Sequence, residues 1–181
     1  MSGLVVPDIR TARLDLVSMS LAFMRALEAG DCTTAGAEIG ATVPASLVEA
    51  LRDFVSYRIP ALEADPASQP WLGRVMLERG PRGVPTVIGT AGFHGPPDDE
   101  GRVELGYGVE PGHRRRGLAT EVVAALLDWA RGQGVERFRA TVGPTNTPSL
   151  AIVRAFGFRE VGVFIDAVDG EELVFDLDPE A

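Results

Sequence analysis

The sequence contains no lysine, one cysteine and two histidines. All 17 basic residues are arginine, and the 26 acidic residues outnumber them, which gives a formal net charge of −9 at pH 7. Without lysine the chain cannot form a Schiff base through an ammonium side chain or complete a P-loop, so both enzyme classes are excluded. The acidic balance also argues against nonspecific binding to nucleic acid and to anionic membranes, because both depend on positive charge.

The few metal-binding and redox side chains exclude further classes. Cys32 alone cannot form a disulfide within the chain, and together with His94 and His113 it provides no zinc-ligand spacing, so we predict no metal site. The start of the chain lacks a basic segment followed by an apolar run. The longest helical apolar stretch, residues 122–130, contains Asp128 and falls far short of the ~20 residues that a membrane span needs. We expect no membrane span and a cytoplasmic location.

The length and composition are those of an ordinary soluble domain. The chain has 181 residues, of which 45% are hydrophobic and 24% are charged, which argues against disorder and against a fibrous protein. One domain takes up about 150 residues. We therefore expect a single domain over residues 1–181, with a core over about residues 11–177.

Hydrophobic periodicity predicts about seven strands and four helices. Ser18 and Ser20 offer an N-cap for the first helix, Pro60 ends or kinks the second, and residues 61–70 form a polar connection. The strands are expected at residues 11–17, 71–78, 84–94, 102–109, 136–142, 159–166 and 171–177. The helices are expected at residues 21–30, 45–57, 117–132 and 148–156.

The order of these elements predicts an α/β (α+β) fold with a mixed central sheet. Strands four and five are joined through a helix, so we expect them to be parallel neighbours with a right-handed crossover. The strands that are joined by hairpins should be antiparallel. Helices are therefore expected on both faces of the sheet.

The most informative segment, residues 103–121, reads VELGYGVEPGHRRRGLATE. A strand leads into a loop rich in glycine and arginine, and the loop becomes the N-terminus of an amphipathic helix. Free backbone N–H groups and the positive end of the helix dipole make such a place an anion site, and Gly117 would let the backbone approach phosphate oxygens. Spacing alone leaves a solvated arginine cluster equally open. A Rossmann fingerprint is a poor fit, because GxGxxG is absent.

The pattern Arg114-x-x-Gly117-x-Ala119 resembles the acetyl-CoA pyrophosphate loop of the GNAT N-acetyltransferase superfamily. Other stretches resemble, in the same order, the branch containing the ribosomal-protein N-terminal acetyltransferases: TARLDL (11–16), IGTAGF (88–93), ELGY (104–107), ATE (119–121) and NTPSLAIVRAFGF (146–158). The resemblance implies a GNAT fold in which acetyl-CoA lies where strands four and five splay apart. It implies cofactor contacts at Val109, Arg114, Arg115, Arg116, Gly117, Leu118, Ala119, Thr120 and Asn146.

The strand before this loop offers a catalytic base. On a regular strand Glu104 shares a face with Gly106 and Gly108, which leaves room for a thioester, and the glycines would also permit a bulge that turns a backbone N–H toward the acetyl carbonyl. By resemblance Glu104 falls where several family members carry a catalytic glutamate. The alternative is an exposed carboxylate that is paired with Arg102 or with an arginine on a neighbouring strand.

The acid for the departing thiolate is less plain. Many family members place a tyrosine four residues before the glycine of the terminal Gly-Phe, and this chain has Val153 there. Resemblance to the ribosomal-protein branch suggests Ser149 as the catalytic acid. The alternatives are that Thr147 or Ser149 caps the short helix, or that the thiolate leaves unaided. We expect Asn146 to hydrogen-bond the splayed strand and the pantetheine amides.

The resemblance implies an acetyl-CoA-dependent N-acetyltransferase that acts on a primary amine, a protein N-terminal α-amine or a small amine, by direct attack on the thioester. The alternative is a noncatalytic acyl-CoA-binding or regulatory GNAT-like module, which Val153 keeps open. We expect the first two helices, residues 61–70 and the segment between the last two strands to set the acceptor, and His94 is a candidate to line its site. A homodimer is left open.

Overall fold

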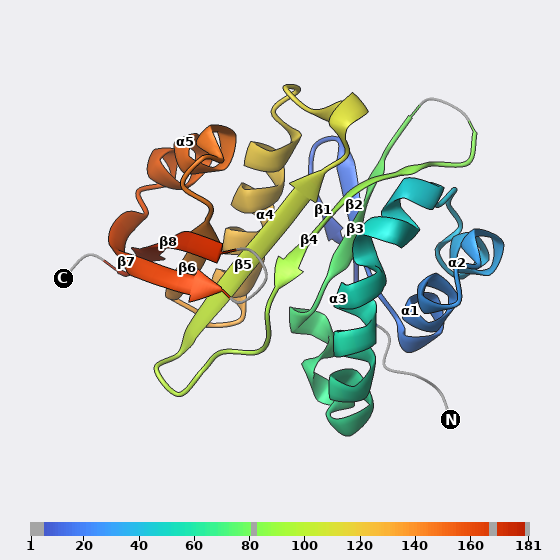
Figure 1. The fold of residues 1–181 in the computed structure, drawn as a ribbon, viewed down its shortest axis with the longest axis horizontal. Helices are drawn as coiled ribbons and strands as arrows, with labels where there is room; N and C mark the ends of the chain where they lie inside the picture. Colours follow the sequence, from blue (N-terminus) through green and yellow to red (C-terminus); the bar gives the residue numbers. More distant parts are fainter. Residues whose placement is uncertain (1–5, 81–82, 167–169, 180–181) are drawn as a thin grey trace.

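The computed structural model describes residues 6–80, 83–166 and 170–179. Within them eight strands form one mixed sheet in the order β1-β2-β3-β4-β5-β6-β8-β7. In Figure 1, α1 and α2 lie at one end of the molecule, and α5 lies with β6, β7 and β8 at the other. The strands are β1 (Ile9–Arg10), β2 (Leu14–Ser18), β3 (Arg74–Glu78), β4 (Val87–Phe93), β5 (Arg102–Val109), β6 (Arg137–Val142), β7 (Arg159–Asp166) and β8 (Gly170–Leu177).

Five α-helices and two short 3-10 helices connect the described strands. Ser20 caps the first helix by accepting a hydrogen bond of 3.1 Å from the Phe23 N–H, which confirms the predicted serine cap. The α-helices are α1 (Leu21–Glu28), α2 (Cys32–Ile39), α3 (Ala45–Ala64), α4 (Leu118–Gly132) and α5 (Thr147–Ala155), and the 3-10 helices are η1 (Pro66–Trp71) and η2 (Pro111–His113).

Each face of the sheet has its own apolar core. Leu16 and Leu105 belong to the core that contains the buried side chains of α4 and α5, such as Val122. On the opposite face Val75 packs with buried residues of α1 and α3, such as Phe23. The prediction of helices on both faces is therefore confirmed, and Figure 1 shows α4 and α3 on opposite sides of the strands.

Strands β5 and β6 are parallel neighbours, as the crossover through α4 predicted, but they pair over only part of their length. Arg102 lies opposite Arg137, and Glu104 lies opposite Arg139, where the register ends. On its other side β5 pairs with β4 without interruption, from Gly89 opposite Val109 to Phe93 opposite Leu105. The expected splay is therefore present, and the bulge that glycines would permit in β5 is absent from this pairing.

The first half of the chain departs most from the sequence prediction. Helix α2, β1 and η1 were not predicted, nor was η2 in the second half. Residues 61–70 were expected to form a polar connection, but they belong to the end of α3 and to η1, with Asp65 between the two helices. Helix α3 continues through Pro60 to Ala64, because Ile59 and Leu62 are buried and hold its last turns against the core. The carbonyl that loses its donor to Pro60 belongs to Ser56, an exposed residue that water can reach.

The last two strands form the predicted hairpin, but β8 and not β7 lies beside β6. Strand β7 is therefore an edge of the sheet. The segment between these strands that was expected to shape the acceptor site, residues 167–169, lies outside the described residues.

Candidate active site

A cavity of about 270 Å³ opens where β5 and β6 part. Its walls come from the end of β4, from β5, from β6, from the start of α5 and from β8. The lining mixes small apolar residues with six polar side chains. The lining residues are His94, Leu105, Gly106, Tyr107, Ala140, Thr141, Val142, Gly143, Asn146, Ser149 and Glu172.

Glu104 lies half-buried at the point where the two strands part. Its Oε1 accepts a hydrogen bond of 2.8 Å from the Thr141 hydroxyl and lies 3.6 Å from His94 Nδ1. Both partners line the cavity. Among the described residues, Glu104 forms no ion pair with an arginine, which was the predicted alternative. Arg102 and Arg139 are paired with Asp176 instead.

His94 takes part of the space above the glycines of β5. A Cβ added at Gly106 would lie 3.1 Å from His94 Nε2, whereas one at Gly108 would meet nothing within 4 Å. The imidazole therefore fits over Gly106 because that residue has no side chain, and the strip is open at Gly108. His94 thus lines the cavity and also contacts Glu104, and its place in an acceptor site stays a prediction.

The N-terminus of α5 brings Asn146 and Ser149 to the cavity. Asn146 is the N-cap, and its side chain accepts the Ser149 backbone N–H at 3.3 Å. The alternative in which Thr147 or Ser149 caps this helix is therefore wrong, and the Ser149 hydroxyl is left for other contacts. Val153, one turn further along α5, is completely buried in the core and does not line the cavity.

Tyr107 is a cavity residue to which the sequence reasoning assigned no role. Its hydroxyl is buried and has no hydrogen-bond partner among the described residues. Burial raises the pKa of the phenol, and an interaction with the Ser149 side chain partly offsets the rise. Tyr107 is the tyrosine of the ELGY stretch, whereas the family pattern places its phenol at position 153, on α5.

Gly117 begins the loop-to-helix transition that the sequence singled out. It adopts a left-handed conformation with φ of 74° and stands as the N-cap of α4. Leu118, Ala119 and Thr120 follow in the first turn, so their backbone N–H groups have no partners within the helix. Leu118 is buried, and its backbone is the part of it that can face a ligand. The helix end is thus built like an anion site.

The three consecutive arginines differ in their contacts. Arg114 Nε donates to the Val109 carbonyl oxygen at 2.8 Å, which ties the loop back to the end of β5. Arg116 forms an ion pair with Glu78 on β3. Arg115 has a positive φ of 60° and no ion-pair partner among the described residues. Arg115 is therefore the arginine with the most freedom to meet an anion.

Glu121, in the first turn of α4, connects the loop to the segment before β2 through hydrogen bonds. It accepts hydrogen bonds from the Arg13 backbone N–H at 2.7 Å and from Arg13 Nε at 2.7 Å, and it also bonds the Thr11 hydroxyl. Burial alone would raise the pKa of Glu121, but these hydrogen bonds outweigh it and lower the pKa overall. Arg13 also donates to the Arg116 carbonyl oxygen at 2.8 Å. The TARLDL stretch therefore positions the loop, a role that its sequence did not reveal.

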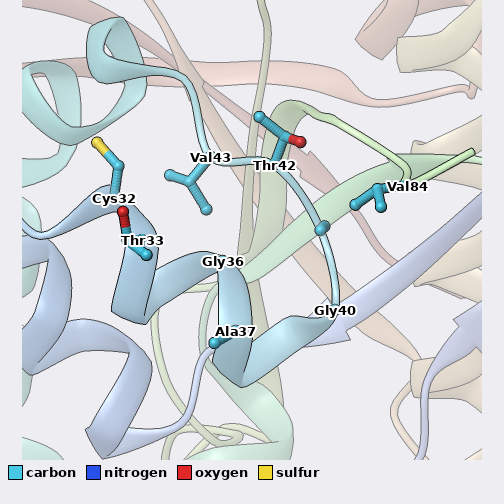
Figure 2. A pocket seen from close by; sticks show the side chains of 9 residues that line it. Cys32, Thr33, Gly36, Ala37, Gly40, Thr42, Val43 and Val84 are labelled. Carbon is cyan, nitrogen blue, oxygen red and sulfur yellow. The ribbon is translucent and has the colours of Figure 1, made fainter.

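A second cavity, of about 480 Å³, lies between α2 and the chain that follows it. Figure 2 shows the short side chains around it, among them Cys32, Thr33, Val43 and Val84. Its lining contains no carboxylate, histidine or arginine. It lies on the α2 side of the molecule, away from α5 (Figure 1), and the Cys32 thiol is the titratable side chain in its lining.

No helix in the described ranges is long and apolar enough to cross a membrane. Residues 6–80, 83–166 and 170–179 also hold no group of three or more histidine, cysteine or acidic side chains that could bind a metal ion.

The described residues thus combine an open mixed sheet, a polar cavity between two parting parallel strands and a helix end of the anion-binding type. A family model described as acetyltransferase (GNAT) domain matches residues 24–159, so the chain belongs to the GNAT acetyltransferase family. The uncharacterized N-acetyltransferase p20 of Bacillus licheniformis is 36% identical over 81 residues, which cover 44% of this chain and 46% of that protein. The chain thus spans less than half of the length of the curated relatives that it matches first.

Solved structures share the fold over nearly the whole chain. A GNAT-family acetyltransferase from Bacillus anthracis matches with a TM-score of 0.61 at 21% identity, covering 94% of this chain and 98% of that one. The ribosomal L7/L12 alpha-N-protein acetyltransferase RimL, in complex with coenzyme A, matches with a TM-score of 0.62 at 16% identity, covering 95% and 98%. At sequence identities this low, the similarity is evidence for a shared fold alone.

Proposed function

We propose that the protein is an acetyl-CoA-dependent N-acetyltransferase that moves an acetyl group to a primary amine by direct attack on the thioester. The observation that carries the proposal is the polar cavity at the parting of β5 and β6, with Glu104 and its partners at one side and Ser149 at the other. Membership of the GNAT family and the likeness to a solved acetyltransferase with bound coenzyme A support it.

The described residues fit acetyl-CoA in two places. The helix end at Gly117, with Arg115 beside it, suits the pyrophosphate, and the open strip at Gly108 leaves room for a chain along β5. Acetyl-CoA supplies an activated acetyl group when bound. Val109, Arg114, Arg116, Leu118, Ala119, Thr120 and Asn146 are the other residues that we propose to contact it.

The β5 backbone is suited to stabilise the carbonyl oxygen in the transition state. The His94 N–H donates to the Glu104 carbonyl at 2.8 Å, and the Glu110 N–H donates to the Ile88 carbonyl at 2.9 Å, so even-numbered residues of β5 bond toward β4. By alternation the N–H groups of the odd-numbered residues of β5 point toward β6. The pairing of Glu104 with Arg139 uses that of Leu105, whereas the Tyr107 N–H lies beyond the last pair, where β5 has parted from β6. An N–H that faces this gap can donate to an oxyanion without any bulge.

Glu104 is the base in this proposal. Its carboxylate takes the amine proton directly or through a water in the cavity, and Thr141 holds its Oε1 in place. An α-amine titrates near 7.7 to 8.0 and a lysine amine near 10.4, so an α-amine is much easier to bring to the neutral, nucleophilic form. This chemistry and the likeness to RimL support a protein N-terminal α-amine as the acceptor.

The direct experiment incubates the purified chain with acetyl-CoA and a panel of peptide N-termini, small amines and lysine-bearing peptides, and measures free thiol. Acceptor-dependent thiol release is expected, with α-amines ahead of lysine side chains. Tight binding of coenzyme A without acetylation of any acceptor would contradict the proposal and favour a noncatalytic acyl-CoA-binding or regulatory module. Equal or faster acetylation of lysine side chains would overturn the acceptor assignment alone.

A further inference from the structure

His94 and Glu104 are neighbours across two paired strands. His94 follows β4 directly, and its N–H donates to the Glu104 carbonyl oxygen at 2.8 Å, which continues the antiparallel pairing of Phe93 with Leu105 by one residue. Phe93 and Leu105 are buried in the core on the α4 and α5 side. Because side chains alternate along a strand, His94 and Glu104 lie side by side on the opposite face of the sheet.

The two nitrogens of the His94 ring have different neighbours. Nδ1 lies 3.6 Å from Glu104 Oε1. Nε2 lies over Gly106, where an added Cβ would be 3.1 Å away. Both His94 and Gly106 line the cavity, whereas Glu104 is not among the described residues that line it. A molecule in the cavity therefore has the imidazole, and not the carboxylate, as its direct neighbour.

Hydrogen bonds fix the positions of both groups. The Thr141 hydroxyl donates to Glu104 Oε1 at 2.8 Å, and Arg58 of α3 donates to the His94 carbonyl oxygen. The distance between Nδ1 and Oε1 is longer than the 2.7–3.2 Å of an ordinary hydrogen bond. Catalytic hydrogen bonds are often long without substrate and shorten in the complex. The His94 side chain is exposed, so a small rotation of the ring can close this distance.

We propose that His94 is a further catalytic residue, which takes the amine proton at Nε2 and passes a proton from Nδ1 to Glu104. The inference rests on the proposed acetyl transfer, and it replaces a direct or water-borne transfer to Glu104 by a path through the ring. An imidazole in water titrates near 6.5, between an α-amine, near 7.7 to 8.0, and a carboxyl group, near 4.3. Two shorter steps in basicity therefore replace one long step.

The bonds and protons balance along this path. The amine nitrogen forms a bond to the acetyl carbon, and the bond from that carbon to sulfur breaks, with its electron pair leaving on the thiolate. The nitrogen loses one proton to His94 Nε2, and Nδ1 gives its own proton to Glu104. Glu104 then returns a proton to Nδ1 as Nε2 releases one to water. Both groups are restored, and no further reactant is needed.

Nuclear magnetic resonance of the ring nitrogens tests this arrangement without turnover. The sequence contains two histidines, so both rings can be assigned by comparison with a His113 variant. At about pH 9, where imidazoles are neutral, His94 should carry its proton on Nδ1, because the partner of one ring nitrogen fixes the tautomer. Glu104→Ala should remove this preference and leave the His113 signals unchanged. A proton on Nε2 in the wild type would overturn the inference, because that nitrogen could then accept nothing.

Chemical rescue separates a proton carrier from a packing residue. His94→Ala should lower kcat by about 10- to 100-fold and keep the affinity for coenzyme A within about twofold. Added imidazole should restore part of the activity, whereas pyrazole, a ring of the same size and much weaker basicity, should not. The matched control, His113→Ala, should gain nothing from imidazole.

The outcomes distinguish the inference from the proposed function. Wild-type kcat in His94→Ala would overturn the inference and leave Glu104 to take the proton directly or through a water. A loss of kcat that neither ring restores, or that both restore equally, would assign His94 a packing role and overturn it as well. An inactive wild type on every acceptor would instead contradict the proposed function.

Discussion

The Thr141 hydroxyl donates a 2.8 Å hydrogen bond to Glu104 across the gap between β6 and β5. The last main-chain pair of these strands joins Glu104 to Arg139, two residues before Thr141. A side-chain bond therefore continues the connection just beyond the point where the backbone ladder ends. It fixes a carboxylate at the edge of the cavity, where a base for the acceptor amine is needed.

Replacing Glu104 tests the proposed base. Glu104→Gln keeps the size of the side chain and an oxygen for Thr141 but removes the proton acceptor, so kcat should fall by about 100-fold or more. The affinity for coenzyme A, measured by calorimetry, should stay within about twofold. The control is Glu49→Gln, on the exposed surface of α3. Wild-type turnover in Glu104→Gln would remove this carboxylate from the mechanism.

Gly117 tests the proposed pyrophosphate loop. A side chain at φ of 74° is strained by about 1–2 kcal/mol, although a Cβ there would have its nearest neighbour, Arg13, at 3.7 Å. Gly117→Val should therefore fold, with a modest loss in the free energy of unfolding, and lose most of its affinity for coenzyme A. Gly132→Ala, at the other end of α4, should bind normally. Undiminished binding by Gly117→Val would mean that the loop is not the phosphate site.

Substitutions at the arginines of the loop should have two kinds of effect, one on coenzyme A binding alone and one on stability as well. Arg115→Ala removes a guanidinium that has no ion-pair partner among the described residues, and it should weaken coenzyme A binding about tenfold at low salt, with little effect on stability. Arg116→Ala breaks the pair with Glu78 and should lower stability as well. Titrations at two salt concentrations and thermal melting distinguish the variants, with Arg52→Ala on α3 as the control. The assignment fails if Arg115→Ala binds as tightly as that control.

The Glu78–Arg116 pair should also give stability a dependence on pH. The hydrogen bond from Arg116 lowers the pKa of Glu78 in the folded chain below its ordinary value. The pair's contribution is thus present above the unfolded pKa, near 4.3, and is lost as pH falls through the lower folded value.

Melting curves of the wild type and Glu78→Gln between pH 7 and pH 3 measure this contribution. At pH 7 the variant should melt a few degrees lower, and in acid the two curves should converge because Glu78 is then protonated in the wild type. A difference that persists unchanged to pH 3 would show that the charge of Glu78 is not its source.

The sequence by itself determined the order of the elements from β3 onward and the loop at Gly117. Alternation along β5 and the helical spacing of Leu118, Val122 and Leu126 are local patterns, because a strand repeats every two residues and a helix about every 3.6. The crossover between β5 and β6 followed from chain connectivity, which makes joined parallel strands neighbours. The splay was expected from the family resemblance.

Tertiary structure alone decided which side chains meet. Thr141 contacts Glu104 from 37 residues away, and Glu121 bonds Arg13 across 108 residues, distances at which no local pattern operates. Packing also outweighed the local preference for a helix end at Pro60, because buried neighbours stabilise α3 beyond this residue. Tyr107 is the clearest case. Its place in ELGY was visible in the sequence, but only the folded chain buries its hydroxyl in the wall of a cavity that Ser149 also lines, because that placement depends on how α5 packs on the sheet.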